Sequence, residues 1–305
     1  MDTITHILAG GVIAYAVKDK YGRAGAGAVL AATVAPDLDM VLMLGDQITY
    51  LQYHRVVGNS LLGVIAITLI VTLAAYRLGR GKAAVGALLA LSFAGVGLHV
   101  LMDLANSYGC KLLWPFTDKW YALDMVFIVD PLLTGLLVLS LIIMRFGADR
   151  TGVLVGCFLL LFSYWGVRYY EHGKAVDRFR AEYPKAAKIS AFPSALDPFS
   201  WHMVAEDEDW FRLGWYNIKL GRWSGNEAIA KEMGNDGIKA ALASDAGRVF
   251  VEFARHPYIS YEELPNGWLV NIQDLRFALR PGDQNFVLTQ QVDKGGKVTK
   301  SEFEF

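Results

Sequence analysis

Residues Ala83–Met102 read AAVGALLALSFAGVGLHVLM, and this stretch decides the fold. It contains no Asp, Glu, Lys or Arg, and His99 is its one ionisable side chain. An α-helix needs about 20 mostly apolar residues to cross the roughly 30 Å hydrocarbon core of a bilayer. The stretch therefore predicts a membrane-spanning helix that carries a single imidazole near its end.

Other apolar runs lie on both sides of this stretch, and nearly all of them precede Arg168. They are Ile4–Val17, Ala24–Leu44, Leu61–Tyr76, Met125–Met144 and Gly152–Val167. Of the 305 residues, 54% are hydrophobic and 19% are charged, whereas soluble domains average about 45–50% apolar and about 25% charged residues. We therefore predict an α-helical integral membrane domain over residues 1–170, with about six membrane segments, some of them broken.

The remaining residues, 171–305, read as a soluble α+β domain with an antiparallel sheet. Alternating patterns predict strands at Val249–Ala254, Ile259–Glu262, Trp268–Ile272, Phe286–Gln291 and Val298–Phe305. Two short helices are expected, at Asn226–Met233 and Ile238–Ser244. The histidines of this domain, His172, His202 and His256, are assigned structural roles.

The loops between the membrane segments differ in basic residues. Eight Lys and Arg residues follow odd-numbered segments and three follow even-numbered ones. Because loops rich in Lys and Arg stay on the cytoplasmic side, we predict a multi-pass protein of the cell (inner) membrane with its C-terminal domain extracytoplasmic. The net charge of −1, without a Lys/Arg block, argues against nucleic acid as a partner. The two cysteines, Cys110 and Cys157, are too few for a disulfide framework.

On this topology, the polar residues of the membrane domain gather at the outward face. Ionisable groups at membrane depth are costly and indicate function. His99 and Asp103 are four residues apart and share one helical face, where an imidazole and a carboxylate can bind one divalent ion. Pro36 disturbs the backbone, which would aim both Asp37 and Asp39 inward. The candidate metal ligands are His6, Asp37, Asp39, His54, His99 and Asp103; the alternatives are hydrogen-bonded core pairs and a solvated turn.

Several motifs together resemble a known family. They are Asp2-Thr-Ile-Thr-His6, Ala35-Pro-Asp37-Leu-Asp39, His54-Arg55, His99-x-x-x-Asp103 and Asn106-Ser-Tyr-Gly109. Over roughly the first 135 residues the chain resembles the YdjM-type membrane-bound metal-dependent hydrolases, a family remotely similar to zinc-dependent phospholipase C. The resemblance implies a His/Asp-bound metal that hydrolyses a phosphoester. Asn59 stands where that family has a second histidine, so Mg²⁺ or Mn²⁺ is an alternative to zinc.

We hypothesise a membrane-embedded hydrolase that acts on a lipid or lipid-linked phosphate, with membrane lipid as its expected partner. Arg55 would stabilise developing negative charge, and Asn59 would orient water or substrate. One of Asp37, Asp39 or Asp103 would serve as general base. The alternative is a non-catalytic membrane module, in which the metal staples the helices and the outer domain binds a partner or a cell-envelope polymer.

Overall fold

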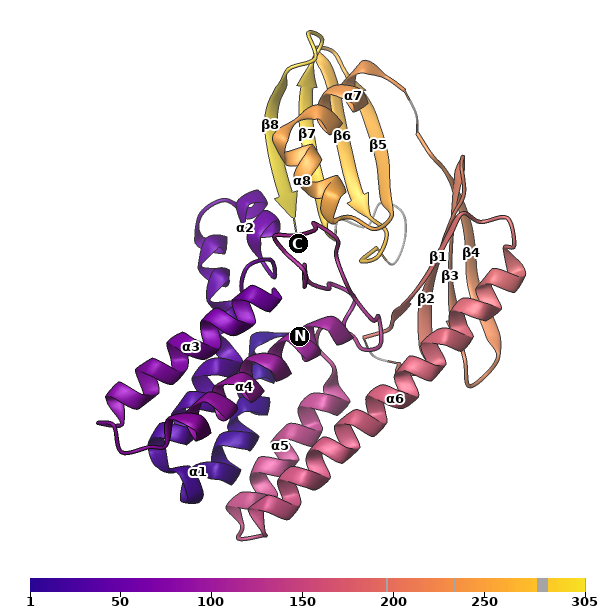
Figure 1. Ribbon diagram of the computed structural model, residues 1–305. Coiled ribbons are helices and arrows are strands. Elements are labelled where there is room, and N and C mark those ends of the chain that lie inside the picture. Colours follow the sequence, from indigo (N-terminus) through magenta and orange to yellow (C-terminus); the bar gives the residue numbers. More distant parts are fainter. Residues whose placement is uncertain (196, 233, 279–284, 305) are drawn as a thin grey trace. The chain divides into compact units, whose positions relative to one another are not determined.

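The computed structural model describes residues 1–195, 197–232, 234–278 and 285–304. The chain divides into two compact units. The first comprises Met1–Val41 and Tyr53–Tyr170, and the second comprises Leu42–Gln52 and Glu171–Phe305. The first unit is helical, and the second contains two antiparallel sheets (Figure 1).

Helix α1, Thr3–Val34, folds back on itself. Asp2 caps its start by accepting the Thr5 N–H at 3.0 Å, and the helix breaks at Gly22, whose φ of 64° is left-handed. The two arms then pack closely, since a Cβ added at Gly10 would lie 2.9 Å from Cβ of Thr33. The segments expected at Ile4–Val17 and Ala24–Leu44 thus correspond to the two arms of one helical hairpin, and the second arm ends at Val34, where η1 follows.

The other elements of the helical region follow in chain order. They are the 3-10 helix η1 (Ala35–Leu44), α2 (Gln47–Tyr53), α3 (Leu61–Leu78), α4 (Val85–Ala105), α5 (Pro131–Arg145) and α6 (Arg150–Glu182). Within the described residues, four spans are long and apolar enough to cross a membrane, namely Thr3–Leu44, α3, α4 and α6, and α5 is a shorter apolar helix. The expected segment Met125–Met144 begins later, because Asp130 caps α5 by accepting the N–H groups of Leu132 and Leu133.

The first sheet has the order β1-β2-β3-β4, with neighbours antiparallel. Its strands are β1 (Lys188–Pro193), β2 (Ser200–Glu206), β3 (Trp210–Asn217) and β4 (Arg222–Ala230). Ala175 and Phe179, in the last turns of α6, pack on one face with Trp201 and Met203. The helix expected at Asn226–Met233 is wrong over its described residues, because β4 extends to Ala230 and Glu227–Ala230 pair with β3. Met233 lies outside the described residues.

The second sheet has the order β5-β6-β7-β8 and carries α7 and α8 on one face (Figure 1). Its elements are α7 (Asp236–Ala243), α8 (Asp245–Phe253), β5 (Pro257–Leu264), β6 (Gly267–Asp274), β7 (Val287–Asp293) and β8 (Val298–Glu304). The last four strands and the helix at Ile238–Ser244 are confirmed, except that Phe305 lies outside the described residues. The strand expected at Val249–Ala254 is wrong, because Ser244 caps a helix there that buries Phe250 and Phe253 on one face.

Candidate metal centre

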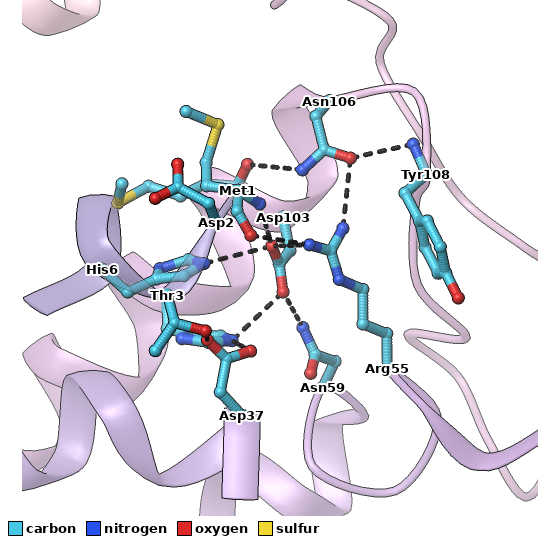
Figure 2. Close-up of polar contacts among 12 residues, drawn as sticks. Met1, Asp2, Thr3, His6, Asp37, Arg55, Asn59, Asp103, Asn106 and Tyr108 are labelled. Atoms are coloured by element: carbon cyan, nitrogen blue, oxygen red, sulfur yellow. Dashed lines mark hydrogen bonds and ion pairs between the residues drawn. The ribbon is translucent and has the colours of Figure 1, made fainter. Parts of the chain in front are cut away.

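Four side chains from three separate segments converge inside the helical unit: His6, Asp37, His99 and Asp103, here called the His/Asp cluster. Each offers one ligand atom, and these atoms all lie within 4.8 Å of one another. The two histidines and Asp103 are fully buried, and Asp37 is 6% exposed. Figure 2 shows His6, Asp37 and Asp103 turned toward a common centre.

Local backbone features bring these residues together. The hairpin of α1 returns the chain to its start, so Thr3 donates its hydroxyl to Oδ2 of Asp37 at 2.8 Å. Helix α4 approaches the second arm of α1 through Gly95, where an added Cβ would lie 2.6 Å from the carbonyl oxygen of Val29. Small residues permit this kind of close packing between membrane helices. His99 and Asp103 then share the inward face of α4, as their spacing predicts.

The ring of His99 is held so that one nitrogen faces the cluster. Its Nδ1 lies 2.8 Å from the carbonyl oxygen of Thr33, and because a carbonyl only accepts, Nδ1 carries the proton. The other ring nitrogen, Nε2, faces the cluster, 3.1 Å from Oδ2 of Asp103 and 3.6 Å from Oδ1 of Asp37.

His6 completes the cluster from the first arm of α1. Its Nε2 lies 3.2 Å from Oδ1 of Asp103, and its ring stacks on that of His99 with centroids 3.8 Å apart. Two imidazoles and two carboxylates are the nitrogen and oxygen ligands that zinc accepts. A cation at the centre of the cluster would be within reach of all four side chains. The cluster can therefore hold a metal ion.

Asp103 is the most heavily contacted member of the cluster. Its Oδ1 lies 3.0 Å from Nη2 of Arg55 and also contacts the amino group of Met1. Its Oδ2 accepts a hydrogen bond of 2.6 Å from Nδ2 of Asn59 (Figure 2). A fully buried carboxylate requires such compensation. Asn59 keeps its other buried polar atom, Oδ1, without a hydrogen-bond partner in the described part of the chain.

Arg55 is fixed beside the cluster by an unusual backbone and by several contacts. Its backbone φ is 60°, and residues other than glycine rarely adopt this left-handed conformation. The guanidinium donates to Oδ1 of Asn106 at 3.1 Å and to the carbonyl oxygen of Met1 at 2.8 Å. It also lies over the ring of Tyr108, 4.8 Å from the centroid.

Two of the six candidate ligands are placed differently. Asp39 accepts the backbone N–H of Arg55 at 3.0 Å, and its Oδ1 lies 2.8 Å from Nδ1 of His54. This Asp39–His54 pair is not part of the His/Asp cluster found among the described residues. Sequence reasoning assigned no role to Thr3, Thr33 or Tyr108. Thr33 contacts His99 through its main-chain carbonyl. Because every residue has such a carbonyl, the amino-acid sequence gives no sign of this contact.

These observations define an integral membrane protein whose helical unit buries a histidine–carboxylate cluster able to hold a metal ion. The chain belongs to the YdjM inner membrane protein family, whose model matches residues 1–175 and so includes the whole cluster. It is also 30% identical over 141 residues to the uncharacterized protein YfhP of Bacillus subtilis (strain 168). That match covers 46% of this chain and 43% of the Bacillus protein. No solved structure matches the chain.

Proposed function

We propose that this protein is a membrane-embedded metal-dependent hydrolase that cleaves a phosphoester of a lipid or lipid-linked substrate at the outer membrane face. The observation that carries the proposal is the convergence of four buried ligand atoms, one each from His6, Asp37, His99 and Asp103, within 4.8 Å of one another. These four residues would hold one divalent ion, zinc by the donor set, with Mg²⁺ or Mn²⁺ as alternatives. Such an ion, when bound, polarises a phosphoryl oxygen and lowers the pKa of water.

The neighbouring residues supply charge and orientation. Arg55 would balance the negative charge that develops on the phosphoryl group, since its guanidinium is already held beside Asp103. Asn59 would orient water or substrate through its unpartnered Oδ1. His54, aligned by Asp39 through its Nδ1, would exchange protons with the attacking or leaving oxygen.

A lipid substrate is favoured by the surroundings of Asp37. The 3-10 helix η1 exposes large apolar side chains directly after this buried carboxylate, among them Leu38 and Val41. Exposed apolar groups next to a polar site suit a ligand with both an acyl chain and a headgroup. The excess of basic residues in the odd-numbered loops supports the outer face as the side of the site.

The test combines bound metal with turnover. The full chain is purified in detergent, its metal content is measured by elemental mass spectrometry, and phosphate or headgroup release is followed on zwitterionic and anionic phospholipids. We expect His99→Ala to lose the stoichiometric metal and all release, because the ring supplies one of the four ligand atoms. His172→Ala is the matched control, since this half-buried histidine lies outside the cluster.

Two outcomes contradict the proposal. Wild-type metal content in His99→Ala would reject the cluster as the metal site. Metal-replete protein without turnover on any phosphoester would reject the hydrolase and leave a membrane module whose helices are stapled by the metal.

A further inference from the structure

A second set of hydrogen-bonded polar side chains lies outside the His/Asp cluster, in the unit that contains the two sheets, here called the β-rich unit. One of its members is His256, to which the sequence analysis assigned a structural role. We propose that Ser190, His256 and Glu206 form a catalytic triad that hydrolyses carboxylic esters carrying a negative charge. Ser190 lies in β1, Glu206 in β2, and His256 directly before β5. This activity does not depend on the His/Asp cluster or on a metal.

The hydrogen bonds give each residue a defined role. Nδ1 of His256 lies 2.8 Å from Oε2 of Glu206, and its Nε2 lies 2.8 Å from Oγ of Ser190. An ionised carboxylate only accepts, so Nδ1 donates to Glu206 and Nε2 accepts the hydroxyl proton of Ser190. Nucleophile, base and orienting carboxylate in this order are the arrangement that activates serine in unrelated hydrolase folds.

The imidazole at the centre is rigidly placed. The side chain of His256 is fully buried. Its carbonyl oxygen accepts the N–H of Leu275 at 3.1 Å, and its ring forms T-shaped contacts with the rings of Phe192 and Phe211. Glu206 is anchored in turn, because its second oxygen, Oε1, lies 2.9 Å from Nζ of Lys231. Such support holds a catalytic constellation in its productive geometry.

The protonation states suit general-base catalysis. Burial lowers the pKa of His256, against the opposing effect of Glu206, so the imidazole is neutral at pH 7. Burial alone would raise the pKa of Glu206, but hydrogen bonds from His256 and Lys231 outweigh it and lower the pKa to about 2. The charged and titratable groups around the imidazole are Glu206, Lys188, Asp274 and His202.

Two cations flank the serine and indicate the substrate class. Lys188 precedes Ser190 by two residues on the same side of β1, and its ammonium donates to the carbonyl oxygen of Arg255. Phe192 follows Ser190 by two residues on that same side of β1, and the guanidinium of Arg255 lies 5.7 Å from the centroid of its ring. These charges would attract an anionic ester and balance the oxyanion formed at its carbonyl.

The reaction has two balanced halves. Oγ of Ser190 bonds to the carbonyl carbon while its proton passes to Nε2 of His256, and the C–O bond to the alcohol breaks as His256 returns that proton to the leaving oxygen. Water then attacks the acyl-Ser190 ester and gives one proton to His256, which passes it to Oγ. The products are the carboxylic acid, the alcohol and the free hydroxyl.

The test uses the full chain in detergent micelles and a fluorophosphonate probe. We expect one adduct, located on Ser190 by mass spectrometry, no adduct in Ser190→Ala, and labelling slowed by about 100-fold or more in His256→Gln. Ser260→Ala, a half-buried serine in β5 of the same unit, is the matched control and should label like the wild type. A wild type without an adduct, or an adduct retained in Ser190→Ala, overturns the triad.

Substrate class and independence from the metal need their own measurements. Hydrolysis of mono-p-nitrophenyl succinate, an anionic ester, should exceed that of neutral p-nitrophenyl butyrate by at least about fivefold, and Lys188→Gln should remove the difference. Equal rates in the wild type overturn the preference for anionic esters. Labelling should survive chelation and persist in His99→Ala, so a failed metal hydrolase leaves this result unchanged. Loss of labelling both on chelation and in His99→Ala would show that the triad does depend on the metal site.

Discussion

At the scale of single residues, the buried charge of Asp103 must be balanced by its neighbours for the helical unit to be stable. Its buried carboxylate is contacted by Arg55, Asn59 and two imidazoles. Removing one partner of a buried ion pair costs about 3–5 kcal/mol, because an uncompensated charge remains. Arg55 therefore has a structural as well as a proposed chemical role, and the activity of Arg55 variants is informative only when their folding is measured alongside.

The carboxylate of Glu206 makes the stability of the β-rich unit depend on pH. Its pKa falls from 4.5 to about 2 on folding, so the stabilisation is complete above about pH 4.5 and is lost as pH falls toward 2. Its side chain is 21% exposed, and solvent screening limits the contribution to about 1 kcal/mol. Glu206→Gln should therefore lower the melting temperature by about 2–4 °C at pH 7, with the difference vanishing near pH 2.

Thermal melts followed by tryptophan fluorescence between pH 7 and pH 2 check this dependence. The neighbouring Glu208→Gln, at an exposed position, is the control and should melt like the wild type at every pH. A constant difference between Glu206→Gln and the wild type over the whole range would contradict the assigned pKa.

The candidate metal site was only partly predictable from residue spacing. His99 and Asp103 could be paired from their i, i+4 positions, and His6 and Asp37 from their place at the same membrane face. Asp37 and Asp39 could not be told apart, because their directions depend on the 3-10 geometry of η1. The left-handed φ of Arg55, which places its N–H on Asp39, has no signature in the sequence either.

At the scale of elements, the approach of α4 to the second arm of α1 depends on Gly95. A Cβ at this position would lie 2.6 Å from the Val29 carbonyl and 2.9 Å from Cβ of Ala32, so Gly95→Ala must push the helices apart. We expect a loss of about 1–3 kcal/mol and weaker metal retention, because His99 is carried on the next turn. Thermal unfolding and elemental analysis of the purified variant measure both effects.

Gly97 provides the control for this substitution. It lies on the same helix, and a Cβ there meets no atom within 4 Å. Gly97→Ala should therefore keep the metal and match or exceed wild-type stability, because alanine is the better helix former by up to about 1 kcal/mol. Equal behaviour of the two variants would show that close packing at Gly95 does not position the cluster.

The helices were more predictable than the strands, and the reason is physical. A membrane helix needs a long apolar run, so α3 and α4 stand out without any knowledge of their neighbours. Strands β1–β4 gain their stability from pairing and from the last turns of α6, and such tertiary context overrides local preference. The helix α8, Asp245–Phe253, was not predicted, because its short apolar run also fits a strand.

At the scale of the whole molecule, the distribution of basic residues predicts which side of the membrane each part occupies. The native cysteines, Cys110 and Cys157, are buried, so single introduced cysteines can be labelled against a low background. Lys82→Cys lies at an exposed position after α3, and Lys294→Cys lies at an exposed turn between β7 and β8.

In spheroplasts, a membrane-impermeant maleimide should label Lys294→Cys alone, because the basic loop after α3 is retained in the cytoplasm. Both should react once detergent opens the membrane. Labelling of Lys82→Cys in intact spheroplasts, with Lys294→Cys protected, would invert the topology and place the His/Asp cluster, and the proposed substrate, at the cytoplasmic leaflet.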